Sequence, residues 1–170
     1  MKHRLCTYPI RTNLILAGDH VRASRHAQTP LVAFTAALTN HLTGLGKGQN
    51  IRFDHVITNI GNGYAPIHGT FTAPIAGMYV FSTTLLSFSN HNDHFQFMLN
   101  GNLVYRMYVG GSGSAGNYDT TGSSVVIHLQ HGDTVAIQNV DVNENVHGYL
   151  YSLFTGYLLK ASEDSEVVGK

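Results

Sequence analysis

The eleven histidines of this 170-residue sequence are the side chains with the widest choice of chemistry. His91, Asp93 and His94 place two imidazoles and a carboxylate close together in the chain, and such groups bind zinc or copper. A fixed H-x₃-H ligand spacing is absent, and histidine also serves as a polar filler where Lys and Glu are scarce. The sequence therefore predicts these three residues as candidate metal ligands, with histidine as an ordinary polar filler as the alternative.

No enzyme motif accompanies these residues. Residues 111–116 match the G-x-G-x-x-G pattern, but a turn sequence follows over 117–122, where a phosphate-binding site needs the start of a helix. A G-x-S-x-G nucleophile elbow and a Walker motif are both absent. The single cysteine, Cys6, has no evident His or Asn partner, and one cysteine excludes an intrachain disulfide. We therefore predict that the chain is not an enzyme.

The composition indicates one folded domain with short flanking segments. Hydrophobic residues make up 43% and charged residues 12%, which excludes a disordered chain. Ten Lys+Arg balance ten Asp+Glu, so we expect no binding of nucleic acid, and no apolar run is long enough for membrane insertion. Residues 1–30 carry five bases and one acid and are predicted to form a poorly ordered basic leader without a clear signal peptide. Residues 31–160 then form the domain, and 161–170 a polar C-terminal tail.

The elements that would position the candidate residues are β-strands. From residue 31 onward apolar residues alternate with period two, beginning with Val32, Phe34, Ala36 and Leu38, which is the pattern of strands with one buried face. Asn100-Gly101 lies between two apolar runs and predicts a tight hairpin, because both residues tolerate positive φ. About nine or ten such runs and no convincing helix predict an all-β sandwich or jelly roll.

The last strand differs from the others because both of its faces are apolar. One face is predicted to carry Leu150, Phe154 and Leu158, and the other Tyr151, Leu153, Tyr157 and Leu159. A one-domain protein has one core, so the second face needs another cover. We predict that a second copy of the chain covers it, with a loop or the N-terminal leader as the alternative.

Fixed spacings link aromatic, glycine and asparagine residues along the middle of the chain, at Phe53, Asn59, Tyr64, Phe71, Gly77, Tyr79 and Phe81. Two later blocks follow, one containing Gly132 and Asp133 and the other Phe154 and Gly156. This pattern resembles the globular-head domain of the complement C1q family over residues 31–160. Thr83 departs from it, since the family usually has an aromatic residue there. The matched residues are interpreted as structural rather than catalytic.

The resemblance implies a ten-stranded jelly roll of the tumour-necrosis-factor type that assembles as a tight homotrimer. It also implies a secreted protein that needs no cofactor and binds other molecules through exposed loops. Because no collagen stalk is encoded, the sequence resembles the stalkless invertebrate members, which recognise microbial glycans in innate immunity. A ligand for a cell-surface receptor and a matrix- or mineral-associated metal-binding protein are the alternatives.

Calcium is a further expectation that comes from the resemblance. Several family members hold this ion near the trimer apex, and Asp119 matches the last of their acidic residues. The earlier acidic pair falls at Gly110 and Gly111, so one carboxylate remains for an ion that needs six to eight oxygens. Asp119 as an ordinary turn residue is the alternative.

Recognition is expected in three loops, over residues 87–94, 110–122 and 141–148, because variable loops on a rigid sandwich carry binding. Tyr108, Tyr118 and Asn143 are the candidate ligand contacts, since tyrosine can stack on a sugar and asparagine can hydrogen-bond it. Both residue types are also common in turns.

Overall fold

The structure is a computed structural model that describes residues 30–89, 91–110 and 118–162. The predicted basic leader, except Pro30, and the polar tail beyond Ser162 lie outside the described residues, as does Cys6. In the described part of the chain every regular element is a strand. A helix that could span a membrane is therefore not found among these residues.

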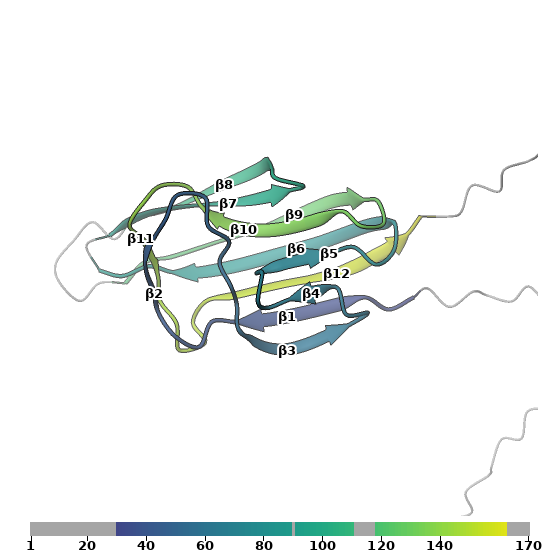
Figure 1. The fold of residues 1–170 in the computed structure, drawn as a ribbon, viewed down its shortest axis with the longest axis horizontal. Helices are drawn as coiled ribbons and strands as arrows, with labels where there is room; N and C mark the ends of the chain where they lie inside the picture. The colour runs from purple at the N-terminus through teal and green to yellow at the C-terminus, as the bar shows by residue number, and fades with distance from the viewer. Residues whose placement is uncertain (1–29, 90, 111–117, 163–170) are drawn as a thin grey trace, which may run out of the picture.

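The chain forms two five-stranded antiparallel sheets that face each other, and a small third sheet at one end (Figure 1). Sheet I has the order β3-β1-β12-β6-β9, sheet II has the order β4-β5-β10-β7-β8, and the small sheet pairs β11 with β2. The strands are β1 (Ala33–Ala37), β2 (Leu42–Leu45), β3 (His55–Ile60), β4 (Tyr64–Ala65), β5 (Thr70–Thr72), β6 (Gly77–Leu86), β7 (Asn92–Leu99), β8 (Asn102–Gly110), β9 (Thr120–Leu129), β10 (Thr134–Asn139), β11 (Glu144–Val146) and β12 (Leu153–Ala161). The ten strands of the two large sheets confirm the predicted jelly roll.

The two ends of this sandwich differ. β1 begins and β12 ends at the same end, whereas β2, β11 and the connections around them lie at the opposite end (Figure 1). We call the second one the loop end.

Alternation of side chains builds the core between the sheets. Val32, Phe34, Ala36 and Leu38 are each at most 2% exposed, as their period-two spacing predicts. The Phe34 ring is the centre of an aromatic cluster, with centroids 4.8 Å from Tyr64, 5.1 Å from Phe71 and 4.9 Å from Phe154. These rings join the sheets over their inner faces.

The other aromatic, glycine and asparagine residues of the pattern that resembles the C1q family surround this aromatic cluster. Phe53, Tyr79 and Phe81 are fully buried beside it. The Asn59 side chain binds the backbone of Tyr64 twice, donating to its carbonyl at 2.9 Å and accepting from its N–H at 3.1 Å. A Cβ at Gly156 would collide with the rings of Phe81 and Phe34, so only glycine lets those rings approach the backbone.

Gly77 and the glycine–aspartate block are placed by backbone contacts. A Cβ at Gly77 would collide with the Lys160 carbonyl on the neighbouring strand. Gly132 has φ 88° in the β9–β10 turn, where the Asp133 carboxylate accepts from Gln130 N–H at 2.7 Å. The hydrogen bond from the Asn100 side chain is the main cause that lowers the pKa of Asp133 from its ordinary value.

The Asn100-Gly101 hairpin is confirmed. Its two residues have φ 50° and 77°, and β7 pairs with β8 on either side. The Asn100 side chain also accepts a hydrogen bond from Thr134 N–H at 2.8 Å, which ties this hairpin to the β9–β10 turn.

Thr83, where the sequence departs from the family pattern, is 2% exposed and makes a hydrogen bond at the edge of the core. Its hydroxyl donates to the Leu153 carbonyl at 2.8 Å. The buried hydroxyl is therefore satisfied where an aromatic ring would otherwise fill space.

The outward face of sheet I carries two rows that cross all five strands in register. The apolar row consists of Ile60, Ala33, Tyr157, Val80 and Val126. The hydroxyl row beside it consists of Thr58, Thr35, Thr155, Ser82 and Ser124. In the single chain Ile60, Tyr157 and Val126 are 44%, 46% and 59% exposed, so the apolar row is open to a partner.

One residue of the last strand was predicted on the wrong face. Leu150 was expected to point into the core with Phe154, but it precedes β12 and is 52% exposed. Its φ of 65° places it in a turn, where strand alternation does not apply. Tyr151, Tyr157 and Leu159 are exposed as predicted, and Leu153 is half-buried.

Candidate functional site

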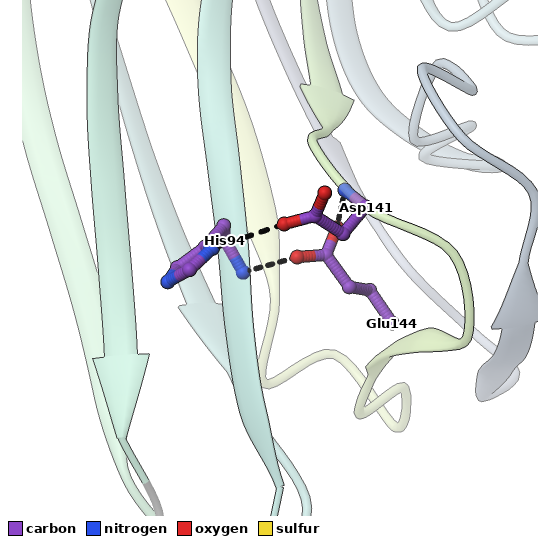
Figure 2. A group of neighbouring side chains, drawn as sticks. All are labelled: His94, Asp141 and Glu144. Atoms are coloured by element: carbon purple, nitrogen blue, oxygen red, sulfur yellow. Dashed lines mark hydrogen bonds and ion pairs between the residues drawn. The ribbon is translucent and has the colours of Figure 1, made fainter.

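His94, Asp141 and Glu144 bring one imidazole and two carboxylates together near the loop end (Figure 2). One ligand atom from each lies within 4.8 Å of the others. His94 comes from β7, Asp141 from the connection after β10, and Glu144 from the start of β11. His94 Nδ1 and Asp141 Oδ2 form an ion pair at 3.3 Å when the imidazole is protonated. We call these residues the His94 group.

Glu144 is the fixed member of the His94 group. Its carboxylate accepts the N–H of His94 at 2.5 Å, of Val140 at 2.8 Å and of Asp141 at 3.1 Å. The side chain therefore joins β7 to the β10–β11 connection. Burial raises the pKa of Glu144 because it penalises the charged form, and the charge of Asp93 adds to the shift, against these hydrogen bonds.

The predicted ligand set of His91, Asp93 and His94 does not form. Neighbouring strand residues point to opposite faces, so Asp93 is buried in the sandwich whereas His94 faces outward. The Asp93 carboxylate accepts from the Ser87 hydroxyl and from Asn145 N–H. Of the three, only His94 belongs to the group of possible metal ligands in the described residues.

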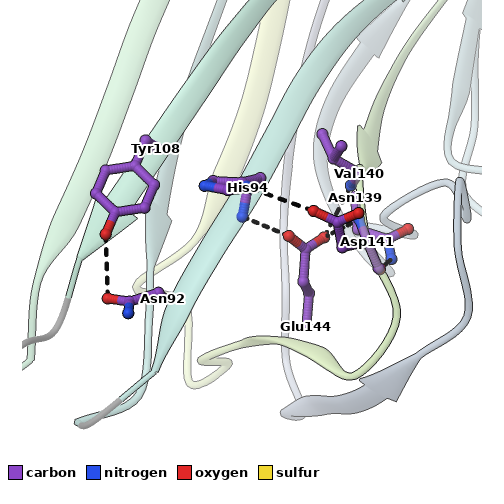
Figure 3. Close-up of polar contacts among 7 residues, drawn as sticks. All are labelled: Asn92, His94, Tyr108, Asn139, Val140, Asp141 and Glu144. Atoms are coloured by element: carbon purple, nitrogen blue, oxygen red, sulfur yellow. Dashed lines mark hydrogen bonds and ion pairs between the residues drawn. The ribbon is translucent and has the colours of Figure 1, made fainter.

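A cavity of about 290 Å³ lies beside His94 and is lined by His94, Arg106, Met107, Tyr108 and Val140. The centroid of the Tyr108 ring is 4.9 Å from that of His94. Its hydroxyl donates to Asn92 Oδ1 at 3.2 Å (Figure 3). Tyr108, a predicted ligand contact, therefore stands at a small cavity whose other polar groups are imidazole and guanidinium.

A second group of rings surrounds His147 at the loop end, and we call it the ring cluster. The His147 ring has centroids 4.2 Å from His41, 5.1 Å from Phe88, 5.2 Å from Tyr118, 5.5 Å from Tyr151 and 5.9 Å from Tyr149. His147 is 9% exposed, whereas the three tyrosines are 52–67% exposed. Four separate connections supply these rings.

The loop that carries Tyr149 is held in an unusual conformation. Tyr149 and Leu150 have φ 55° and 65°, in the left-handed region that bulky side chains rarely adopt. Their N–H groups donate to the carbonyls of Thr39 and Leu38 at 2.8 and 2.9 Å. Gly148 N–H donates to His41 Nδ1 at 3.1 Å. The backbone contacts thus hold two apolar side chains toward solvent.

The other predicted residues lie in turns. Asn143 is exposed with φ 63°, and its carbonyl accepts from the Asn145 side chain at 3.0 Å. Asp119 is exposed, and its carbonyl accepts from Ser87 N–H at 2.9 Å. Gly111 to Asn117 lie outside the described residues, so the expected calcium loop is not described as a whole.

Sequence reasoning did not name Asp141 and Glu144 as partners of His94, nor His41 and His147 as members of one cluster. It named the 141–148 loop, which contains three of these residues. Asp141 and Glu144 come close to His94 because β7 pairs with β10, which places the β10–β11 connection beside His94. A single sequence does not state that pairing.

A profile of the C1q domain matches residues 33–159. The chain is 33% identical to complement C1q tumor necrosis factor-related protein 3 of Mus musculus over 131 residues, 75% of this chain and 51% of that protein. It is 32% identical over 133 residues to a subcomponent of complement C1q of Homo sapiens, covering 77% of this chain and 51% of that subcomponent. Heavy metal-binding protein HIP of Mytilus edulis is 30% identical over 138 residues, 75% of this chain and 60% of that protein. The chain thus spans about half the length of the first two relatives.

Solved structures share the fold. The globular domain of zebrafish complement 1qA superposes with a TM-score of 0.63 at 17% identity, covering 77% of this chain and 99% of that domain. Eiger TNF from S. frugiperda gives 0.62 at 13% identity, covering 80% and 97%. At these identities the likeness concerns the fold alone.

Proposed function

This chain belongs to the C1q domain family, and from that membership we propose that it is a secreted, non-enzymatic recognition protein whose trimeric head binds glycans. The observation that carries the proposal is the ring cluster. Three tyrosine rings stay more than half exposed although each contacts the same buried histidine. Exposed aromatic rings with a hydroxyl at the edge suit the apolar face and the hydroxyls of a sugar ring.

The location of the ring cluster supports the same function. Its residues belong to the connections from β1 to β2, β6 to β7, β8 to β9 and β11 to β12. These connections lie at the loop end, away from the end where β1 begins and β12 ends (Figure 1). If the apolar row of sheet I packs about a threefold axis, three copies of the ring cluster face the same side. Weak binding at one site then becomes stronger through avidity on a surface that repeats the same sugar.

A glycan array tests this function, run with calcium and with a chelator. We expect the wild-type protein to bind a set of glycans and Tyr149→Ala to lose most of that signal. Tyr105→Ala is the matched control, because Tyr105 is 49% exposed on β8 and belongs neither to the ring cluster nor to the cavity lining. Circular dichroism and thermal unfolding check that both variants fold. Equal glycan signals from Tyr149→Ala and the wild type, or no glycan bound by any of them, would contradict the proposal.

The cytokine-like alternative predicts a different result. Binding to intact cells that persists after enzymatic removal of surface glycans, together with a blank glycan array, would indicate a protein receptor. The same Tyr149→Ala and Tyr105→Ala pair then tells whether the ring cluster is the contact.

A second function, binding of divalent metal ions, is favoured by the His94 group. The relative from Mytilus edulis is named a heavy metal-binding protein. Equilibrium dialysis of the purified chain against zinc, cadmium and calcium, followed by elemental analysis, tests this function. Metal contents equal to those of the dialysis buffer would contradict it.

A further inference from the structure

We infer that His94, Asp141 and Glu144 form one binding site for a transition-metal ion of the zinc type, and that this site discriminates against calcium. The inference rests on the second function proposed above and assigns it to specific atoms. Its basis is the geometry of the three side chains and the lone pairs that each has available.

The three donors converge from different parts of the chain. Nδ1 of His94 and Oδ2 of Asp141 are 3.3 Å apart. One imidazole nitrogen of His94 and one carboxylate oxygen each of Asp141 and Glu144 form a triangle whose sides are at most 4.8 Å. An ion within such a triangle can reach all three atoms at the usual metal–ligand lengths of about 2.0–2.2 Å after small side-chain rotations. His94 binds the ion as a neutral imidazole, through the lone pair of Nδ1. The proton with which Nδ1 bonds Asp141 is therefore released to solvent when the ion binds.

Each side chain can present a lone pair to the ion, the His94 imidazole once its Nδ1 proton has left. Asp141 has a side chain that is 58% exposed, and His94 one that is 45% exposed, so both can turn toward an ion at the surface. Glu144 accepts three backbone N–H groups and has about four lone-pair positions, so it can offer one. Glu144 is therefore an anchored ligand, while Asp141 and His94 are adjustable ones.

The charges around the site favour a dication over an empty group. Asp141 and Glu144 supply two negative charges, and the buried Asp93 carboxylate is close enough to act on Glu144. Arg106 lines the cavity on the other side of His94 and opposes a cation. The carboxylates outnumber it, so a bound dication leaves the group closer to neutral.

The donor set also selects the kind of metal. Calcium takes six to eight oxygen ligands and does not use imidazole in its usual sites. Zinc and copper accept one imidazole nitrogen with carboxylate oxygens, and water from the cavity side completes a four-coordinate shell. The site is thus distinct from the calcium site that Asp119 was expected to support.

Isothermal titration of the full chain, without an added histidine tag, tests the site with zinc chloride and calcium chloride. We expect one zinc ion per chain at the His94 group and no saturable calcium heat there. His94→Ala and Asp141→Asn should each weaken that zinc binding by about tenfold or more, since each removes one of three protein donors. Glu144 is left unchanged because its variants would release three backbone N–H groups.

His131→Ala is the matched control, because His131 is exposed in the β9–β10 turn and is not part of the group. It should bind zinc as the wild type does. Zinc binding of unchanged affinity and stoichiometry in both His94→Ala and Asp141→Asn would overturn the site while leaving metal binding as a function. No zinc binding by the wild type would overturn both.

Discussion

The apolar row of sheet I leads to a test of assembly through Tyr157→Asp. Tyr157 lies at the centre of that row on β12 and is 46% exposed in the single chain. A tyrosine covers about 150–250 Å² when fully buried, so about 70–115 Å² of it remains to be covered. At about 25 cal/mol per Å², that cover is worth about 2–3 kcal/mol in each protomer.

The aspartate removes this gain and adds a cost. A carboxylate without a cationic partner in a covered interface costs several kcal/mol more. A loss of about 4 kcal/mol per protomer weakens association by about a thousandfold. We therefore expect wild-type protein to have the mass of three chains at micromolar concentration and Tyr157→Asp to have the mass of one.

Size-exclusion chromatography with light scattering measures these masses. Tyr105→Asp makes the same change of charge at a tyrosine that is 49% exposed on β8 of sheet II, and it should keep the wild-type mass. Circular dichroism shows whether each variant is folded. A wild type that stays monomeric at high concentration, or a folded Tyr157→Asp that keeps the wild-type mass, would refute the reasoning.

Three further predictions concern stability. Asn59→Ala loses both bonds to the Tyr64 backbone and should lower the free energy of unfolding by about 2–3 kcal/mol in urea denaturation; a loss below measurement error would contradict the bridging role. Gly156→Ala places a Cβ against two aromatic rings and should cost about 1–3 kcal/mol in the same assay, and an unchanged midpoint would show that the rings can move. The pKa of Asp133 is lowered from 3.8, mainly by the Asn100 hydrogen bond, so its ionised form stabilises the fold at neutral pH and this contribution is lost as the pH falls below 3.8. The difference in thermal midpoint between wild type and Asp133→Ala should therefore shrink over that range, and a difference that stays constant from neutral pH to pH below 3.8 would contradict it.

The fold could be predicted because its signals are local. Alternating apolar residues indicated the strands, and Asn100-Gly101 indicated a hairpin whose positive φ values the structure confirms. The error at Leu150 has a local cause of another kind, because two left-handed residues interrupt the alternation just before β12. Because neither residue is glycine, the residue types at these two positions did not indicate a turn.

The His94 group could not be predicted in full because its members are 47 and 50 residues from His94 in the chain. Only the packing of the β10–β11 connection against β7 brings them together. The wrong ligand set arose because residues 87–94 were assigned to a loop, whereas β7 begins at Asn92. Asp93 and His94 are neighbours in a strand, and neighbours in a strand point to opposite faces.

The hydroxyl row sets how much it costs to remove water from sheet I. Thr35 and Thr155 share a hydrogen bond at 2.9 Å, Thr155 donates to the Phe34 carbonyl at 2.8 Å, and Ser82 and Ser124 are 2.6 Å apart. Since four of the five hydroxyls in the row are partnered within their own sheet, removing water from the row leaves few donors without a partner. A partner that covers such a surface can therefore displace its water almost as readily as from an apolar surface. While a newly made chain is still alone in solution, the hydroxyl oxygens of the row can still bind water.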